Sequence, residues 1–367
     1  MKLAYFTMPL HPLGRDYTVT LKEDREAVLL ADELGFEEAF FGEHTTDLLE
    51  NIPSCLVFIA SLIHDAKNIT FGSATVNLPS RHPAAVASEV AMLDHMCEGR
   101  FIFGISPGGL KSDAEVYGNV DKNRTEMMVE AIDHILDIWT KEPPYNLKGR
   151  YWNITTEQTY EPDRGQGVLL RPYQKPHPPI MVTVVEPYSK GITAAAKRGW
   201  TPASANFLLP QWVKTHWPKY VEGCAAAGRR ADPRDWRVAK SVFVADDDRT
   251  ARRYGKGKDG PYYHYYEQLM HKLIKAGRAN LFKYDRNEPD EAVSVARSMD
   301  DLVICGTVDN VVEQILAYRE YIGDFGTLLY AGHDWKDKTL ARRSMELMAT
   351  KVIPAVNRAI GQSQAAE

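Results

Sequence analysis

The chain has 367 residues, of which 44% are hydrophobic and 25% are charged. These values are typical of a globular protein with a sizeable core, and they exclude disorder over most of the chain. Its 44 basic and 49 acidic residues give a net charge of −5, without a run of five like charges. Electrostatics therefore favour neither a nucleic acid nor an anionic membrane as a partner.

The cysteines and the N-terminus indicate the compartment. Four scattered cysteines without a CxxC pair predict reduced, mostly buried thiols rather than a zinc site or a disulfide framework. The first residues lack the apolar core of a signal peptide, and no apolar run approaches the roughly 18 residues that cross a bilayer. We therefore expect a cytoplasmic protein without a membrane partner.

Short apolar runs alternate with longer amphipathic segments along the chain, which is typical of βα units around a parallel sheet. Eight runs predict strands: Lys2–Met8, Glu38–Glu43, Ile69–Leu78, Phe101–Ser106, Ile180–Val185, Gly199–Ala203, Arg237–Ala245 and Gly326–Ala331. Eight strands alternating with helices favour a closed (β/α)₈ TIM barrel over an open doubly wound sheet, although the sixth run is weak. An open sheet would also carry a glycine-rich turn after its first strand, where this sequence reads MPLHPLGRD.

Two segments represent the helices between these strands. Leu21–Leu34 has apolar residues at helical spacing, acidic residues in its first turn and Gly35 at its end. Pro83–Met96 begins with a proline at the first helical position. Both are expected to be amphipathic crossover helices.

Two insertions interrupt the alternation, after the fourth and seventh strands. Residues 142–179 are rich in Pro, Tyr and Gly and predict a loop with one short hairpin. Residues 255–300 contain the tyrosine cluster Tyr262, Tyr263, Tyr265 and Tyr266 followed by an amphipathic piece. Long insertions after barrel strands often act as lids, so 255–300 is the candidate lid of a single domain spanning 1–367.

The active site of such a barrel is built at the carboxyl ends of its strands. The residues at these ends are Met8, Pro9 and His11; Glu43, His44 and Thr45; Thr75, Asn77, Arg81 and His82; Ser106 to Gly109; Glu186 to Gly191; Ser204 and Asn206; and His333, Asp334 and Trp335.

Two of these turns suit a ligand. Ser189-Lys190-Gly191 begins a helix directly after a strand, so backbone N–H groups, a hydroxyl and an ammonium would face a bound phosphate. A simple N-cap role for Ser189 fits the sequence equally well. Ser106-Pro107-Gly108-Gly109 lets a flat ligand approach the backbone, although a plain tight turn is the commoner use of such residues.

Three histidines in these positions titrate near neutral pH in their ordinary state: His44, His82 and His333. A structural role is commoner for any single histidine, but the position of His44 directly after an apolar strand favours the barrel mouth. His82 precedes Pro83 and fits a capping or loop-orienting role, while His333 and Trp335 fit a pocket wall against a flat ring. A metal site is not expected, because the first strand lacks the histidine pair of barrel metallohydrolases.

Three blocks carry a family resemblance: ADELGFEEAFFGEH (31–44), SATVNLPSRHPAAVASEVAMLDHMCEGRFIFGIS (73–106) and PPIMVTVVEPYSKGITAAAKRGW (178–200). In this order they resemble the bacterial-luciferase-like, flavin-dependent oxidoreductases over nearly the whole chain. ENIPS (50–54), SPGGLKSDAEVYG (106–118) and FGTLLYAGHDW (325–335) resemble the branch of limonene and diketocamphane monooxygenases.

The resemblance implies a monooxygenase that uses O₂ and reduced FMN, delivered by a separate flavin reductase, on a small apolar substrate such as a terpenoid or cyclic ketone. His44 would be the catalytic residue, stabilising the oxygen adduct or moving protons. The implied cofactor-binding residues are Ala74, Thr75, Asn77, Ser106, Gly108, Glu186, Pro187, Tyr188, Ser189 and Lys190. The implied substrate pocket consists of Met8, His11, His333 and Trp335.

The resemblance also implies a non-prolyl cis peptide at Ala74-Thr75 and a homodimer packed through the helices near residues 53–66 and 83–97. Ser106 stands where luciferase has a reactive cysteine and Pro107 where it has an arginine that contacts the flavin, so light emission is not implied. Two alternatives stay open: a deazaflavin-dependent oxidoreductase on the same fold, and a non-catalytic partner subunit.

Overall fold

Residues 1–366 are described by the structure, a computed structural model. The chain divides into two compact units. The first unit comprises Met1–Phe40, Ala66–Ile69 and Val182–Glu367, and the second comprises Phe41–Asp65 and Thr70–Met181.

The strands form a closed parallel barrel. Within residues 1–366 its members are β1 (Lys2–Thr7), β2 (Glu38–Phe41), β3 (Thr70–Ser73), β5 (Phe101–Ser106), β8 (Ile180–Val184), β9 (Thr201–Ser204), β10 (Arg237–Val244) and β12 (Thr327–Gly332). They pair in the order β10-β12-β1-β2-β3-β5-β8-β9, and β9 pairs with β10 again. All eight predicted runs contribute a strand, including the weak sixth one, so the predicted TIM barrel is confirmed.

Two strands differ from the prediction. The third run is interrupted by a cis peptide bond at Ala74-Thr75, the position that the resemblance implies, and continues as β4 (Val76–Asn77). A further strand, β11 (Val303–Gly306), pairs with Ser241–Val244 of β10 and was not predicted. It directly follows α11 (Val295–Leu302), so its four residues look like the end of an amphipathic helix in the sequence.

The two representative helices are present. α3 (Pro83–Met96) has the predicted bounds, whereas α1 (Tyr17–Glu33) begins four residues earlier than predicted. The side chain of Asp16 accepts a hydrogen bond from the backbone N–H of Val19 and so caps α1 at this earlier point.

The remaining helices follow in chain order. They are α2 (Cys55–Ala60), α4 (Lys111–Val116), α5 (Arg124–Thr140), α6 (Lys190–Lys197), α7 (Pro210–Val213), α8 (His216–Ala226), α9 (Asp248–Gly255), α10 (Pro261–Lys275), α12 (Val308–Ile322), α13 (Lys338–Leu347) and α14 (Ile353–Ala366).

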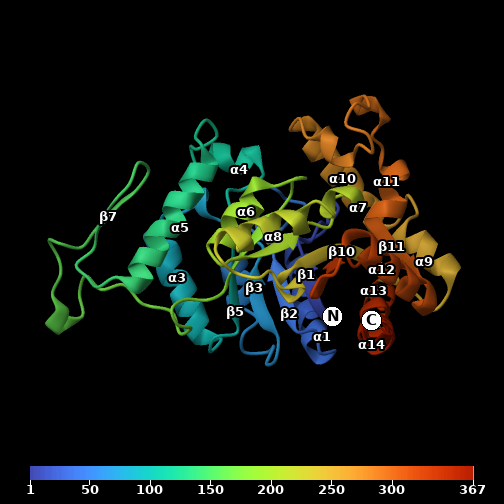
Figure 1. Ribbon diagram of the computed structural model, residues 1–367, viewed down its shortest axis with the longest axis horizontal. Coiled ribbons are helices and arrows are strands. Elements are labelled where there is room, and N and C mark those ends of the chain that lie inside the picture. The colour runs from blue at the N-terminus through green and yellow to red at the C-terminus, as the bar shows by residue number, and fades with distance from the viewer. Residues whose placement is uncertain (367) are drawn as a thin grey trace. The chain divides into compact units, whose positions relative to one another are not determined.

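The insertion 142–179 of the second unit contains the predicted hairpin. β6 (Asn146–Lys148) and β7 (Asn153–Thr155) are antiparallel and extend beyond α5 (Figure 1). The carboxylate of Glu130 on α5 accepts backbone hydrogen bonds of 2.8 Å from Arg150, Tyr151 and Trp152. These bonds hold the turn of the hairpin against the helix.

The insertion 255–300 of the first unit consists of α10, short 3₁₀ turns and α11 (Figure 1). Tyr262, Tyr265 and Tyr266 of the tyrosine cluster are buried. The Tyr262 hydroxyl donates to the carbonyl of Val242 (2.8 Å), and the Tyr266 hydroxyl is hydrogen-bonded to Ser241 (2.8 Å). These tyrosines therefore anchor α10 to β10, and the lid role of 255–300 stays a prediction.

Two expectations from composition concern burial and membranes. Cys55, Cys97, Cys224 and Cys305 are free and buried, as predicted. Among residues 1–366, we find no helix whose length and apolar character would allow it to span a bilayer.

Candidate functional site

His44 lies just past the end of β2, in the second unit, between two carboxylates. Its Nδ1 is 2.8 Å from Oδ2 of Asp113, and its Nε2 is 3.1 Å from Oε2 of Glu50. The side chain of His44 is 13% exposed. The imidazole is therefore held by Asp113 at Nδ1, its Nε2 lies close to Glu50, and part of the ring stays accessible.

Asp113, in the first turn of α4, is the better anchored of the two carboxylates. Its Oδ1 accepts hydrogen bonds from the backbone N–H groups of Thr45 (3.1 Å) and Thr46 (2.8 Å) and from the Thr46 hydroxyl (2.6 Å). Burial acts to raise the pKa of Asp113, but hydrogen bonds from His44 and Thr46 outweigh it, and the pKa is lowered. Asp113 is thus an ionised group that fixes the orientation of His44.

Neither Asp113 nor Glu50 was predicted as a site residue. Both lie in stretches that carry the resemblance, Glu50 at the start of ENIPS and Asp113 within SPGGLKSDAEVYG. Asp113 lies in the first turn of a helix directly after the glycine-rich turn, and this position could have indicated a site residue.

The structure brings together the predicted cofactor-binding residues of the second unit. The Thr75 hydroxyl donates to Ser106 Oγ (2.6 Å), which donates to Asn77 Oδ1 (2.8 Å) and accepts from the N–H of Gly108 (3.1 Å). Gly108 has φ +76°, which favours glycine. Thr75 follows Ala74 through the cis bond, so all five predicted residues belong to one cluster.

Glu43 connects this cluster to the end of β2. Its buried carboxylate accepts from the backbone N–H groups of Asn77 (3.0 Å) and Cys55 (3.1 Å). The Asn77 amide in turn donates to the carbonyl oxygen of Glu43 (3.2 Å). Glu43 therefore positions Asn77 and α2.

The five remaining predicted cofactor residues, Glu186 to Lys190, follow β8 in the first unit and lead into α6. Ser189 is the N-cap residue of α6, but its side chain makes no capping hydrogen bond. Tyr188 has φ +54°, and its N–H donates to Thr215 Oγ1 (2.8 Å). Ser189 therefore occupies the N-cap position without a capping hydrogen bond, and its role at a phosphate stays a prediction.

A pocket of about 340 Å³ adjoins this turn. It is lined by Glu186, Pro187, Trp212, Arg278, Asn280, Leu281 and Arg286. Sequence reasoning missed both arginines, because they come from the insertion 255–300, more than eighty residues further along the chain.

The predicted substrate residues Met8, His11, His333 and Trp335 all belong to the first unit, and Met8 is half-buried there. The buried His11 is enclosed by charges: its Nδ1 lies 2.6 Å from Asp334 and its Nε2 lies 3.1 Å from both carboxylate oxygens of Asp24. Burial acts to lower the pKa of His11, but the hydrogen bonds with both carboxylates raise it to about 9. His11 is therefore a buried imidazolium.

His333 has the opposite surroundings. Its ring stacks on Tyr265 with centroids 4.0 Å apart and meets the edge of Tyr262 at 4.6 Å, while its Nε2 is 2.9 Å from Ser241 Oγ. Burial lowers the pKa of His333 to about 3. The expectation that His333 titrates near neutral pH is therefore wrong, because the ring stays neutral. Trp335 is buried as well.

His82 has the capping role that its sequence position allowed. It is exposed, and its Nδ1 accepts a hydrogen bond from the N–H of Ala84 (3.3 Å) at the start of α3.

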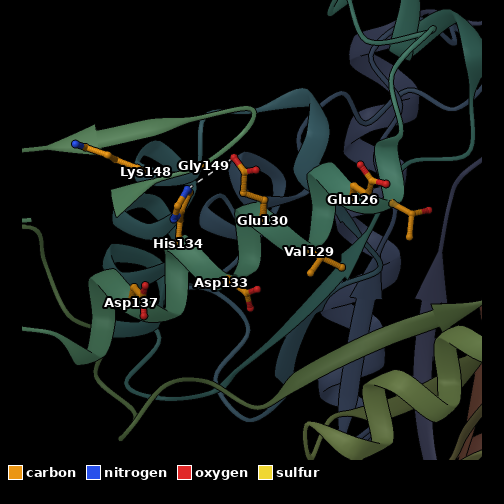
Figure 2. Close-up of a pocket in the computed structure, with 9 residues that line it drawn as sticks. Glu126, Val129, Glu130, Asp133, His134, Asp137, Lys148 and Gly149 are labelled. Atoms are coloured by element: carbon orange, nitrogen blue, oxygen red, sulfur yellow. Dashed lines mark ion pairs between the residues drawn. The ribbon is translucent and has the colours of Figure 1, made fainter. Parts of the chain in front are cut away.

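A separate groove of about 510 Å³ runs along α5 in the second unit. Figure 2 shows the carboxylates of Glu126, Glu130, Asp133 and Asp137 along this helix, with His134 near Glu130. Its lining includes none of the predicted site residues, and its negative charge disfavours a phosphate. Within residues 1–366, no three or more of the His, Cys, Asp and Glu side chains are grouped to hold a metal ion.

Comparison with known proteins identifies the family of this chain. The family model described as luciferase-like monooxygenase matches residues 1–324. The chain belongs to this family. The 4-hydroxyprotoasukamycin monooxygenase of Streptomyces nodosus subsp. asukaensis is 30% identical, covering 96% of this chain and 91% of the relative.

Two further relatives represent the branch that the sequence resembles. The limonene 1,2-monooxygenase of Rhodococcus erythropolis is 28% identical, covering 97% of this chain and 87% of the relative. The solved oxygenating constituent of 3,6-diketocamphane monooxygenase from Pseudomonas putida, in complex with FMN, is 28% identical with a TM-score of 0.86, covering 96% of this chain and 98% of that one. The expected membership of the luciferase-like family, with limonene and diketocamphane monooxygenases as relatives, is confirmed.

Proposed function

We propose that this luciferase-like protein is the oxygenase component of a two-component monooxygenase, which uses reduced FMN and O₂ to oxygenate a small apolar substrate such as a terpenoid or cyclic ketone. The observation that carries the proposal is His44, held between Asp113 and Glu50 at the end of β2. Similarity over nearly the whole chain to an FMN-bound monooxygenase supports the choice of cofactor. A separate flavin reductase is the proposed partner, since a trigonelline monooxygenase relative is named as an oxygenase component.

The residues at the strand ends fit FMN chemically. Hydroxyl, amide and backbone N–H groups of Thr75, Asn77, Ser106 and Gly108 suit the polar edge of an isoalloxazine ring, and Ala74 offers an apolar contact. A phosphate would be suited by the hydroxyl of Ser189, which makes no capping hydrogen bond, and by the ammonium of Lys190. The backbone of Glu186, Pro187 and Tyr188 completes this proposed phosphate site. Bound reduced FMN would supply the electrons that activate O₂.

His44 is the proposed catalytic residue. The ionised carboxylate of Asp113 accepts a hydrogen bond from Nδ1–H of His44, which fixes the ring orientation and leaves Nε2, close to Glu50, to move a proton. The low exposure of the ring limits access of water, which otherwise favours unproductive peroxide release.

The proposed substrate pocket contains Met8, His333 and Trp335 as apolar or neutral surface. The neutral ring of His333, backed by Tyr262 and Tyr265, fits an uncharged apolar substrate better than a charged one. His11 has both nitrogens bonded to carboxylates, so its proposed part is to hold Asp334 in place beside this wall.

A homodimer packed through α2 and α3 is also proposed. Val57 on α2 is 71% exposed, and Met92 and Met96 on α3 are 58% and 37% exposed. Exposed apolar side chains on neighbouring helices are typical of an interface. The mass in solution, measured by light scattering for the protein and for Met92→Glu, tests this assembly.

We also propose that the chain is a single domain, because its strands form one closed ring. This domain would span residues 1–367, with 142–179 and 255–300 as insertions. A cytoplasmic location is proposed on the four buried free thiols.

Oxygen uptake tests the proposed function. The purified chain is mixed with chemically reduced FMN and a panel of terpenoids and cyclic ketones, while oxygen, hydrogen peroxide and oxygenated product are measured together. Substrate-dependent product formation with less peroxide is expected. A deazaflavin enzyme would reduce or oxidise substrate without consuming oxygen, and a non-catalytic subunit would not bind reduced FMN; either result contradicts the proposal.

A further inference from the structure

The pocket beside the turn 186–190 has a chemistry that the proposed function does not explain. Two guanidinium groups line it, Arg278 directly after α10 and Arg286 in the irregular segment 276–294 that leads to α11. Apart from Glu186, the walls are otherwise apolar or neutral, and they include the indole of Trp212 and the ring of Pro187.

Both arginines contact the turn expected at the phosphate or the residue next to it. Arg278 Nη2 donates to the carbonyl of Val185 (2.9 Å), the residue before Glu186. The guanidinium of Arg286 lies 5.0 Å from the ring centroid of Tyr188, the residue before Ser189, and 5.4 Å from that of Trp212. These two side chains therefore connect the segment 276–294 to the turn.

The positive charge of this pocket is not balanced within the described residues. Arg278 has the carboxylate of Glu186 at 3.7 Å, outside hydrogen-bonding distance, and that carboxylate is 68% exposed. Burial lowers the pKa of Arg278, which means that its charge is partly desolvated. Arg286 has ring contacts but no ion pair within residues 1–366. Two cations against one loosely placed carboxylate leave a net positive charge suited to a phosphate monoester, which carries nearly two negative charges at neutral pH.

We propose that Arg278 and Arg286 form a phosphate clamp that holds the phosphate of the flavin at the turn 186–190 and thereby fixes the segment 276–294 on the site. The clamp deepens the proposed function and rests on it. It makes the protein selective for FMN over riboflavin. It also predicts that binding of the cofactor phosphate strengthens the attachment of the segment 276–294 to the turn.

Paired titrations with FMN and riboflavin test the clamp, using the full chain and following flavin fluorescence under anaerobic conditions. Arg278→Gln and Arg286→Gln remove each charge but keep much of the side-chain length. Arg253→Gln is the matched control, because Arg253 is exposed on α9 and does not line the pocket. Thermal melts of each variant report whether the fold is kept.

The expected result is phosphate-specific. Each clamp variant weakens FMN binding by about 10-fold to 100-fold, the effect of losing a hydrogen bond to a charged group, while riboflavin affinity changes less than about 2-fold. Arg253→Gln changes neither affinity. In the wild-type protein, FMN but not riboflavin slows tryptic cleavage within 276–294, as mapped by mass spectrometry.

Three outcomes overturn the clamp. Equal affinity of the wild-type protein for FMN and riboflavin excludes it while leaving the flavin proposal intact. Equal weakening of both ligands in Arg278→Gln and Arg286→Gln assigns the arginines to folding of the turn. Failure of the wild-type protein to bind either flavin removes the proposed function together with the clamp.

Discussion

His44 and His11 have the same kind of partner, a pair of carboxylates, but they differ in solvent exposure. Each imidazole lies between two carboxylates, Asp113 and Glu50 for His44, and Asp334 and Asp24 for His11. The side chain of His44 is 13% exposed, whereas that of His11 is 4% exposed. Arg15 also donates to Asp334 (2.5 Å), so the His11 cluster contains further charge compensation.

This difference in exposure supports different roles for the two histidines. The imidazolium of His11 is buried between two carboxylates that would lose its charge-assisted hydrogen bonds without it, so we assign its main effect to stability. The side chain of His44 keeps a part that is accessible to a ligand, so we assign its main effect to turnover. A histidine between carboxylates therefore does not mark a catalytic site until its access to ligand is known.

The largest expected effect is that of His44→Ala. Removing a proton-transferring side chain typically costs about 10²-fold to 10⁴-fold in rate, so we expect product formation to fall at least 100-fold. Flavin affinity should change little, because Thr75, Asn77 and Ser106 keep their mutual hydrogen bonds. Product, oxygen and peroxide are measured together, and FMN titration is the control. Unchanged coupled turnover would falsify the assignment of His44.

The next effect is that of His11→Gln on the free energy of unfolding. The pKa of His11 is raised in the folded protein to about 9 from 6.5, so its stabilisation is present below about pH 6.5 and is lost as pH rises through about 9. The shift corresponds to about 3 kcal/mol. Chemical denaturation at pH 6 to 9.5 measures it.

The wild-type protein should lose this stability relative to His11→Gln across that interval, so the two curves converge at high pH. The comparison between variants is needed because burial lowers the pKa of Lys240 to about 7. This neutral lysine makes both proteins more stable as pH rises from about 7 to 10.5, the reverse direction. Parallel curves for the two proteins would show that His11 carries no folding-linked proton.

The partners of His44 also show which parts of the site can be predicted from the sequence. Local patterns were sufficient for the eight barrel strands and for α3. They also placed Thr75, Asn77, Ser106 and Gly108 at strand ends, where these residues share hydrogen bonds, while their role at a flavin stays a prediction. They did not reveal Asp113, whose contact with His44 spans 69 residues of sequence. Arg278 and Arg286 were hidden for the same reason, since an irregular insertion gives no periodic signal of where its side chains return.

His333 illustrates a different limit. Its place after β12 was predictable, but its protonation depends on how Tyr262 and Tyr265 of α10 pack against it. The sequence placed these tyrosines in the candidate lid, a role that stays a prediction. Packing buries them, and desolvation by such neighbours removes the imidazole charge at neutral pH.

The smallest expected effect is that of His82→Ala, which tests whether a histidine near the strand ends matters merely by position. His82 is exposed and accepts a single 3.3 Å hydrogen bond from the N–H of Ala84 at the start of α3. Loss of an N-cap costs about 0.5–2 kcal/mol, and this long bond places the cost at the lower end. We expect a lowering of the melting temperature by a few degrees or less, with turnover and FMN affinity within 2-fold of the wild-type values. If His82→Ala instead lost product formation as His44→Ala does, the distinction between ligand-facing and structural histidines would fail. The turn before α3 would then have to be counted with His44 in the active site.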